Sequence, residues 1–293
     1  DWYFMCHGKR VYDRSRYQLD FRNPQVRAHA TEVIDRVVNE YGVGYIKMDY
    51  NIEPGIGTEL DADSYGDGLL GHNRAYLEWL DGIFEKYPDL IIENCSSGGL
   101  RMDYAMLSRY SIQSTSDQED YVRYATITAN APSAVTPEQA AVWSYPLTNG
   151  DCEEVIFNMV NALLLRIHQS GHLVNLSPER FGYVKEAISY YKTIRHLTKK
   201  ALPYWPLGLS SYNDPWVSLG LEAEGKDFLA VWRRDSQSPV QEIPVKHLKG
   251  KEVEAVCAYP QSAECGFHWN KEAGTLTVEL PERVSARIFE LRY

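Results

Sequence analysis

A short apolar segment that ends in charged residues most constrains the fold of this chain. Residues 45–51 read Tyr-Ile-Lys-Met-Asp-Tyr-Asn. Tyr45 and Ile46 are typical of a β-strand, whereas Lys and Asp side chains are almost never fully buried unless they are paired. In α/β barrels, charged residues gather at the carboxyl ends of the strands, where the active site forms. The segment therefore predicts either a catalytic strand end or a structural Lys47–Asp49 ion pair.

The residues before this strand predict a strand–helix–strand unit. Residues 17–21 have the composition of a short strand. Asn23 and Pro24 are typical of a helix cap and of the first helical position, and apolar residues then recur every three or four positions up to residue 41. Glycines end this helix just before the strand at 45. Because a strand–helix–strand unit of this kind joins parallel strands, we expect the strands at 17–21 and at 45 to be parallel.

Strands and helices alternate up to about residue 200, and the pattern changes afterwards. We expect further strands at 90–94 and 111–115, and a loop over 52–72 whose length is typical of a functional loop. The helices are expected at 73–87, 102–109, 119–130, 137–143, 153–169 and 178–200. Short strands separated by turns follow Pro203 and predict an all-β module, an antiparallel sandwich. The predicted domains are therefore residues 1–203 and residues 204–293.

Charge and composition exclude several classes of partner. The net charge of −10 disfavours nucleic acid and anionic membranes, and no apolar run reaches the length of a membrane span. Five scattered cysteines predict free thiols in a reducing compartment, so we expect a cytoplasmic location. The chain begins without an initiator Met or a signal-peptide pattern. We expect it to be a piece of a longer protein, which leaves export open.

Polar clusters follow three of the predicted strands: Lys47 with Asp49, the stretch 94–99, and Ser116 with Asp117. Two carboxylates at one barrel mouth suit glycoside hydrolysis, in which one attacks the anomeric carbon and the other protonates the leaving oxygen. Lys47 lies two positions before Asp49, on the same face of the strand, where its charge would keep Asp49 ionised. A metal site is the alternative, although only Asp120 adds a close ligand.

Three ordered motifs resemble those of glycoside hydrolase family 36. Residues 47–51 look like the family's nucleophile motif, K-W-D-M-N. Residues 93–101, Glu-Asn-Cys-Ser-Ser-Gly-Gly-Leu-Arg, are similar to E-x-C-S-S-G-G-x-R, and residues 115–120 resemble T-S-D-x-x-D. The order and approximate spacing of the motifs agree, and the stretch 166–173 and the β module follow as in the family. The resemblance implies an α/β fold, a partial (β/α)8 TIM-type barrel followed by a C-terminal antiparallel β-sandwich.

The resemblance also implies a retaining α-galactosidase-type hydrolase that releases terminal α-linked galactose by double displacement. Asp49 would be the nucleophile and Asp117 the acid/base. The implied substrate-binding residues are Lys47, Arg14, Asn51, Cys95, Ser97 and Gly98, with Arg16 as a competing candidate for Arg14. No cofactor or metal is implied, the implied partners are α-galactoside sugars, and relatives often form homo-oligomers.

One departure from the family lies at the start of the chain. Family members have an N-terminal β domain and two earlier barrel strands, which carry part of the galactose site, and this sequence resembles only the C-terminal portion. Activity of this piece alone is therefore not implied. An α-N-acetylgalactosaminidase, a galactosyl transferase and a non-catalytic carbohydrate-binding relic remain alternatives.

One pair of histidines has a spacing that can occur in zinc sites. His168 and His172 are four residues apart on a predicted helix. A zinc-binding HExxH helix needs a Glu beside the first His, and this sequence has none there. We therefore expect structural or pocket-lining roles for both.

Overall fold

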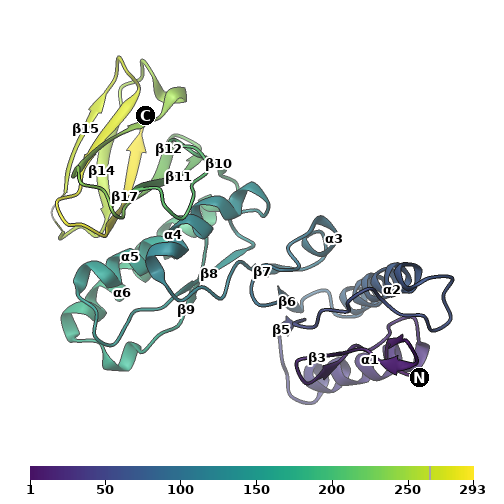
Figure 1. Ribbon diagram of the computed structural model, residues 1–293. Helices are drawn as coiled ribbons and strands as arrows, with labels where there is room; N and C mark the ends of the chain where they lie inside the picture. Colours follow the sequence, from purple (N-terminus) through teal and green to yellow (C-terminus); the bar gives the residue numbers. More distant parts are fainter. Residues whose placement is uncertain (264) are drawn as a thin grey trace. The chain divides into compact units, whose positions relative to one another are not determined.

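The computed structural model describes residues 1–263 and 265–293, and it divides into two compact units, Asp1–Ser114 and Thr115–Tyr293. Figure 1 labels the helices and strands of both. Within the described residues, every helix is too short or too polar to cross a membrane. The boundary between residues 203 and 204 stays a prediction.

Unit 1 is built on three parallel strands, β5 (Tyr45–Asp49), β6 (Ile91–Cys95) and β7 (Ile112–Ser114), paired in that order. Its helices are α1 (Pro24–Asn39), α2 (Tyr65–Lys86) and α3 (Tyr104–Leu107). The predicted start of α1 is confirmed, because the Asn23 side chain accepts a hydrogen bond from the Gln25 N–H at 2.8 Å. The parallel neighbour of β5 is β6, the next strand along the chain, rather than the segment 17–21.

One hydrophobic core holds the helices of unit 1 against its strands. Helices α1 and α2 lie side by side (Figure 1), and Trp79 Nε1 of α2 donates to Thr31 of α1 at 2.9 Å. Leu80 and Ile92 are fully buried between them and β6. Burying one such side chain stabilises a fold by roughly 1.5–3 kcal/mol. This core therefore holds β5 and β6 in place against α1 and α2.

The strand predicted at 17–21 is wrong. Two short antiparallel pairs occupy the start of the chain, β1 (Met5–Cys6) with β2 (Lys9–Arg10) and β3 (Tyr12–Asp13) with β4 (Arg16–Tyr17). Arg14 and Ser15 adopt positive φ angles of 44° and 68° and form the turn between β3 and β4. The strand therefore ends at Tyr17, and it belongs to a hairpin rather than to a parallel strand–helix unit.

Helix α2 begins eight residues earlier than predicted, at Tyr65, after a cap in which Ser64 accepts from the Asp67 N–H. The glycines in its first turns have low helix propensity, which is why the sequence suggests a loop. Gly68 is needed there because a Cβ would lie 2.3 Å from the Thr58 carbonyl oxygen. A tertiary contact thus overrides the local preference.

Unit 2 opens with two parallel strands, β8 (Ala140–Ser144) and β9 (Arg166–Gln169), and three helices, α4 (Tyr121–Asn130), α5 (Cys152–Leu163) and α6 (Pro178–Thr198). The helix predicted at 137–143 is wrong, since this short apolar run is β8; periodicity alone cannot separate a buried strand from a helix. The helix predicted at 153–169 ends at Leu163 and is followed by β9. His168 therefore lies on a strand, and the helical His168–His172 pair does not exist.

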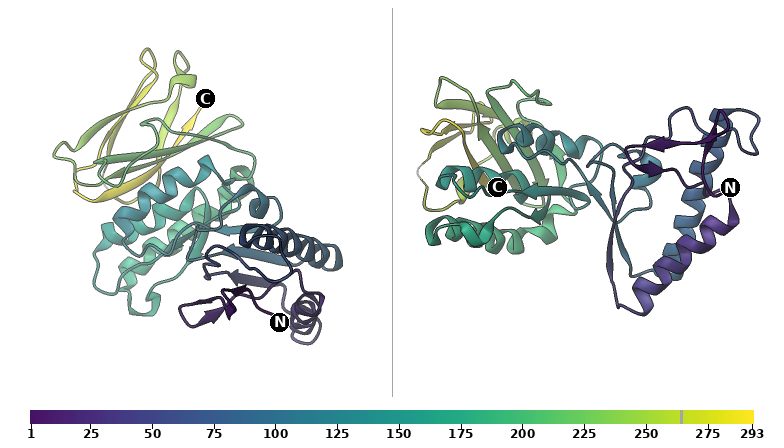
Figure 2. Two further views of the ribbon diagram at one scale, coloured as in Figure 1. Left: turned by 45° about the vertical axis from the view of Figure 1, so that its right-hand side comes forward. Right: turned by 60° about the horizontal axis from the view of Figure 1, so that its bottom comes forward.

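The C-terminal region consists of two antiparallel sheets. One has the order β10-β11-β12-β17-β14 and the other β13-β16-β15. Their bounds are β10 (Leu202–Tyr204), β11 (Trp216–Ala223), β12 (Lys226–Arg233), β13 (Val240–Pro244), β14 (Glu254–Tyr259), β15 (Gly266–Asn270), β16 (Thr275–Glu279) and β17 (Ser285–Arg292). Buried residues of both sheets, including Val231, Phe289 and Val278, form one core. Figure 2 shows α4, α5 and α6 beside the larger sheet, and Arg287 of β17 bonds Glu153 of α5 at 2.7 Å.

Candidate active site

Side chains along β5 alternate between solvent and core. Tyr45, Lys47 and Asp49 lie on the exposed face, whereas Ile46 and Met48 pack against the core of unit 1. This alternation is the strict period of a strand. Asp49 and Lys47 thus share one face, as the sequence predicts, and Met48, which replaces the family's Trp, contributes to packing.

A buried carboxylate on the neighbouring strand holds Lys47. The register of β5 and β6 sets Lys47 opposite Glu93, and Lys47 Nζ lies 3.5 Å from Glu93 Oε1. The Tyr45 hydroxyl donates to the other oxygen of Glu93, which is only 1% exposed. Because a buried carboxylate is costly unless it is paired and hydrogen-bonded, this trio gives Lys47 a defined position beside Asp49.

Cys95 lies opposite Asp49 in the same register. Burial raises the pKa of the Cys95 thiol; a backbone hydrogen bond with Gly98 lowers that pKa, and a hydrogen bond with Asp49 raises it. A thiol with a raised pKa stays protonated at neutral pH and can donate to a carboxylate. Cys95 is therefore suited to orienting Asp49 rather than to attacking a substrate.

The loops that follow β5 and β6 are joined by short hydrogen bonds. Asn51 Oδ1 accepts from the Ser97 N–H at 2.6 Å, and the Ser96 hydroxyl donates to the Tyr50 carbonyl at 2.6 Å. Ser97 and Gly98 adopt positive φ angles of 41° and 81°. The structure thus brings Asn51, Ser97 and Gly98 together at the carboxyl ends of the strands that carry Asp49 and Cys95.

Arg101 strengthens this connection, and sequence reasoning missed its role. Its guanidinium lies 3.7 Å from the centroid of the Tyr50 ring, and it donates to the carbonyls of Tyr50 and Ile52 at 3.1 and 2.9 Å. Such a stacked cation with fixed donors is a typical use of Arg. Glu93 and Arg101 are the first and last residues of the second family motif, residues 93–101. Their positions in that motif are the sequence signal that could have identified them as site residues.

The two competing arginines differ in their contacts. The Arg14 side chain is 69% exposed and lies 3.7 Å from Asp13 and from Glu53. Arg16 Nη1 donates to the Asn51 carbonyl at 2.8 Å. Both arginines therefore contact the loop after β5, Arg16 through the Asn51 carbonyl and Arg14 through the Glu53 carboxylate. The substrate-binding role given to Arg14 stays a prediction. A cavity of about 230 Å³, lined by Asp49, Tyr50 and residues of the segment 17–21, lies beside this loop.

Asp117 belongs to unit 2 and lies exposed in the loop before α4. Two hydroxyl groups hold the backbone in front of it: Thr115 donates to the Ala141 carbonyl at 2.7 Å, and Tyr124 donates to the Ser116 carbonyl at 3.2 Å. Asp120 caps α4 by accepting from the Val122 N–H at 3.0 Å. Asp120 is thus committed to the helix terminus, whereas Asp117, like Glu119, is exposed.

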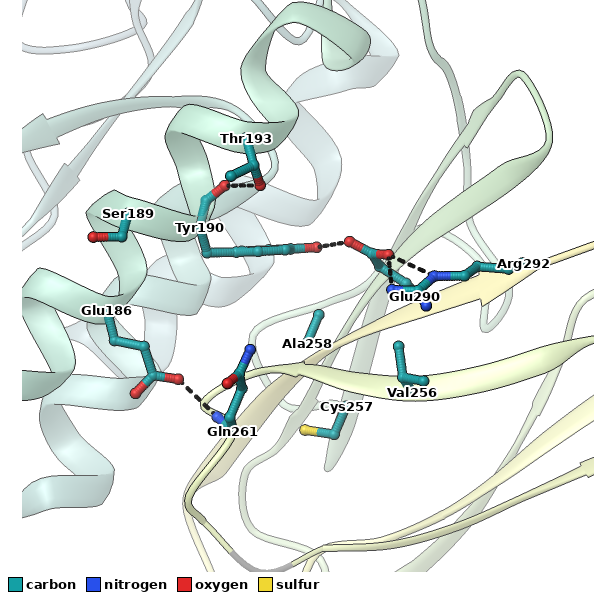
Figure 3. Close-up of a pocket in the computed structure, with 10 residues that line it drawn as sticks. All are labelled: Glu186, Ser189, Tyr190, Thr193, Val256, Cys257, Ala258, Gln261, Glu290 and Arg292. Carbon is teal, nitrogen blue, oxygen red and sulfur yellow. Dashed lines mark hydrogen bonds and ion pairs between the residues drawn. The ribbon is translucent and has the colours of Figure 1, made fainter.

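Among the residues that the structure describes, no group of three or more His, Cys, Asp or Glu side chains could hold a metal ion. A cavity of about 620 Å³ lies elsewhere in unit 2, between α6 and the strands β14 and β17 (Figure 3). Tyr190 reaches from α6 to donate to Glu290 at 3.1 Å, and Arg292 pairs with the same carboxylate at 2.9 Å. Because the charged groups that line this cavity bond mainly to one another, we attribute the cavity to the packing of α6 against the sheet.

Comparison with known proteins identifies the family. The Melibiase family model matches residues 1–200. The chain belongs to the melibiase family. Among relatives of this melibiase chain, the bifunctional alpha-galactosidase/sucrose kinase AgaSK of Mediterraneibacter gnavus is 27% identical over 276 residues, covering 89% of this chain and 28% of that protein. Alpha-galactosidase Mel36A of Lactobacillus acidophilus is 25% identical over 211 residues, covering 70% of this chain and 29% of that protein.

Solved structures show the same fold. A variant of the GH36 alpha-galactosidase AgaA from Geobacillus stearothermophilus, in complex with 1-deoxygalactonojirimycin, has a TM-score of 0.82 at 18% identity and matches 100% of this chain and 41% of its own. These comparisons confirm the resemblance to glycoside hydrolase family 36 and the fold of a partial (β/α)8 barrel with a C-terminal β-sandwich. The melibiase chain spans less than a third of the length of the two curated relatives.

Proposed function

We propose that this melibiase chain supplies the nucleophile and the acid/base of a retaining glycoside hydrolase that releases terminal α-linked galactose. The observation that carries the proposal is the surroundings of Asp49. Its carboxylate stands on the exposed face of β5, beside Lys47 and the Cys95 thiol, at the strand ends where barrel enzymes build their active sites. The family and the names of its relatives support the substrate class.

In the proposed reaction, an Asp49 oxygen attacks the anomeric carbon while Asp117 gives its proton to the leaving glycosidic oxygen. The bond to the leaving group breaks as a galactosyl ester forms on Asp49. Asp117, now ionised, takes a proton from water, whose oxygen attacks the anomeric carbon and releases galactose and free Asp49. Two inversions retain the α configuration.

The neighbouring groups have defined tasks in this scheme. Lys47 donates to hydroxyls of the bound sugar. Cys95 and Gly98 line the side of the 2-hydroxyl, and Asn51 holds the neighbouring Ser97. The α-N-acetylgalactosaminidase alternative needs room for an acetamido group at this place, so the relative rates on the two sugars separate the alternatives.

The experiment measures hydrolysis of an aryl α-galactoside by the whole protein, with Asp49→Ala as its partner variant and NMR to identify the first anomer released. We expect α-galactose to appear first and the variant to lose hydrolysis. A variant as active as the wild type would reject Asp49 as nucleophile, and β-galactose as the first product would reject retention. The cytoplasmic location and the homo-oligomer stay predictions.

A further inference from the structure

A second cavity in unit 2 lies at the carboxyl ends of β8 and β9. Its volume is about 300 Å³, and it is lined by Glu119, residues 145–147 and residues 170–172. Glu119 follows Asp117 by two positions. The cavity is therefore next to the candidate acid/base. Its wall includes the end of the stretch 166–173, which resembles the corresponding stretch of the family.

A buried ion pair fixes the loop after β8. Glu154, 4% exposed, accepts from the Leu147 N–H at 3.0 Å and from Arg180 Nη2 at 2.8 Å. Arg180 also donates to the carbonyls of Leu147, Thr148 and Asp151 at 2.6, 3.0 and 3.2 Å. Because charge-assisted hydrogen bonds of this kind are strong when buried, the wall of the cavity is held in one conformation.

The loop after β9 is held against the first one by close backbone approach. Gly171 has a φ of 77°, and a Cβ there would lie 2.7 Å from the Pro146 carbonyl oxygen. The Ser170 N–H donates to the Ser144 carbonyl at 2.9 Å. Only glycine accommodates both the positive φ and the contact, so the two loops form a built cavity rather than an incidental gap.

The chemistry of the lining matches an uncharged polyhydroxyl ligand. Glu119 supplies an acceptor, Tyr145 and Ser170 supply hydroxyls, and His172 supplies an imidazole. The Tyr145 ring stacks on Trp143 with centroids 5.9 Å apart, which holds the ring in place. Burial raises the pKa of Tyr145 to about 12, with the charges of Asp117 and Glu119 adding to it, so the phenol remains a neutral donor.

We propose that this cavity binds the sugar that departs when the galactosidic bond breaks. The inference rests on the proposed function, because the acid/base of a retaining enzyme must lie next to the leaving oxygen. The leaving sugar is held by hydrogen bonds from Tyr145 and His172 and to Glu119, while Asp117 protonates its departing oxygen. A sugar acceptor that attacks the galactosyl ester occupies the same cavity and gives its hydroxyl proton to Asp117.

The test compares two substrates of the whole protein, raffinose and an aryl α-galactoside, in the variants Tyr145→Phe and His172→Ala. Each variant removes a hydrogen bond that the leaving sugar makes and that an aryl group lacks. The value of kcat/KM for raffinose divided by that for the aryl α-galactoside is therefore expected to fall by about 10-fold. Tyr212→Phe and His196→Ala are matched controls, since both residues are exposed and lie outside the cavity. In the controls the ratio stays that of the wild type.

A second measurement does not depend on how much of a variant folds. With the aryl α-galactoside as donor and sucrose as acceptor, the yield of transfer product is divided by the yield of free galactose. Tyr145→Phe is expected to lower this quotient by about 10-fold, because misfolded protein scales both yields equally. If both ratios match the wild type while Asp49→Ala is inactive, the cavity proposal is wrong and the proposed function stands. If Asp117→Ala keeps full activity on raffinose, the proposed function fails first.

Discussion

The surroundings of Asp49 and Asp117 differ in what holds each carboxylate in place. Asp49 is the last residue of β5, and its neighbours Lys47, Glu93 and Cys95 are set by the register of two paired strands. Asp117 lies in a loop beyond β7, where the hydroxyls of Thr115 and Tyr124 fix the backbone.

The difference corresponds to the two tasks that we propose for these carboxylates. A nucleophile must be placed within a fraction of an ångström of the anomeric carbon, and a strand in a packed sheet provides that rigidity. An acid/base must meet first the leaving oxygen and then a water, so a loop position beside a leaving-group cavity suits it. The following predictions test this contrast, beginning with the largest effect.

The first prediction concerns the two carboxylates themselves. Asp49→Ala is expected to lower kcat by about 10⁴-fold or more on any α-galactoside, because no covalent intermediate can form. Asp117→Ala should lower kcat by about 10²–10⁴-fold on raffinose, the usual range for a lost general acid, and by much less on an aryl galactoside with an acidic leaving group. Equal losses on both substrates in Asp117→Ala would contradict its role as acid.

The second prediction removes the partner of Lys47. Glu93→Gln keeps the shape of the side chain but leaves Lys47 without its buried counter-charge, and a misplaced donor should lower kcat/KM by about 10–100-fold. Asp81→Asn is the matched control, since its ion pair with Arg109 at 2.7 Å lies near the surface. Such pairs contribute only about 0–1 kcal/mol to stability. A Glu93→Gln enzyme with wild-type kinetics would show that Lys47 is positioned by other groups.

The third prediction is a pH dependence of stability in unit 1. His72 accepts from the Phe21 N–H at 3.1 Å and lies 2.8 Å from the Tyr50 hydroxyl, next to the end of β5. Burial lowers its pKa to about 4 from 6.5, with smaller effects from Asp20, Arg101 and Arg22. The unfolded chain therefore binds the proton first, and stability is lost as pH falls from 6.5 to about 4, by up to about 3 kcal/mol.

Denaturant unfolding at a series of pH values checks this dependence. His72→Gln should flatten the curve between pH 4 and 6.5, whereas His196→Gln, at an exposed position, should leave it as in the wild type. A His72→Gln curve that stays as steep as the wild type would assign the acid sensitivity to other groups.

The smallest effect is expected from the loop that holds Asp117. Tyr124→Phe removes the hydrogen bond to the Ser116 carbonyl, and also the contacts of the hydroxyl with Thr115 and with the Trp143 N–H. Leaving these buried groups without their partner should cost about 1–3 kcal/mol of stability. Activity on raffinose should fall more than activity on the aryl galactoside. A variant with unchanged stability and unchanged substrate ratio would show that the loop does not depend on Tyr124.

Much of the fold and site could be read from the sequence because strand ends carry a strong signal. The apolar-to-charged transition at residues 45–51 predicted β5, and Asn23-Pro24 predicted the start of α1. The sequence predicts helices where β8 and β9 lie for two different reasons. The short apolar run of β8 has no period of its own, and β9, Arg166–Gln169, follows the end of α5 so closely that it reads as a continuation of that helix. The early start of α2 was missed because Gly68 is selected by its contact with Thr58.

The site was less predictable than the fold in one respect. The position of Lys47 depends on Glu93, 46 residues away, and that of Leu147 depends on Arg180. Such long-range pairs follow from strand register and loop packing, which a single sequence does not encode locally. The resemblance to the family identified the motifs, and the structure shows which side chains hold the motif residues in place.

The covalent intermediate gives the most direct test of the central claim that Asp49 is the nucleophile. The whole protein would be treated with a fluorinated α-galactosyl donor that forms the ester faster than water removes it, then digested, and the labelled peptide mapped by mass spectrometry. We expect one added galactosyl group, on Asp49, and none in Asp49→Ala. A label on another residue, or rapid turnover that releases β-galactose without any label, would contradict it.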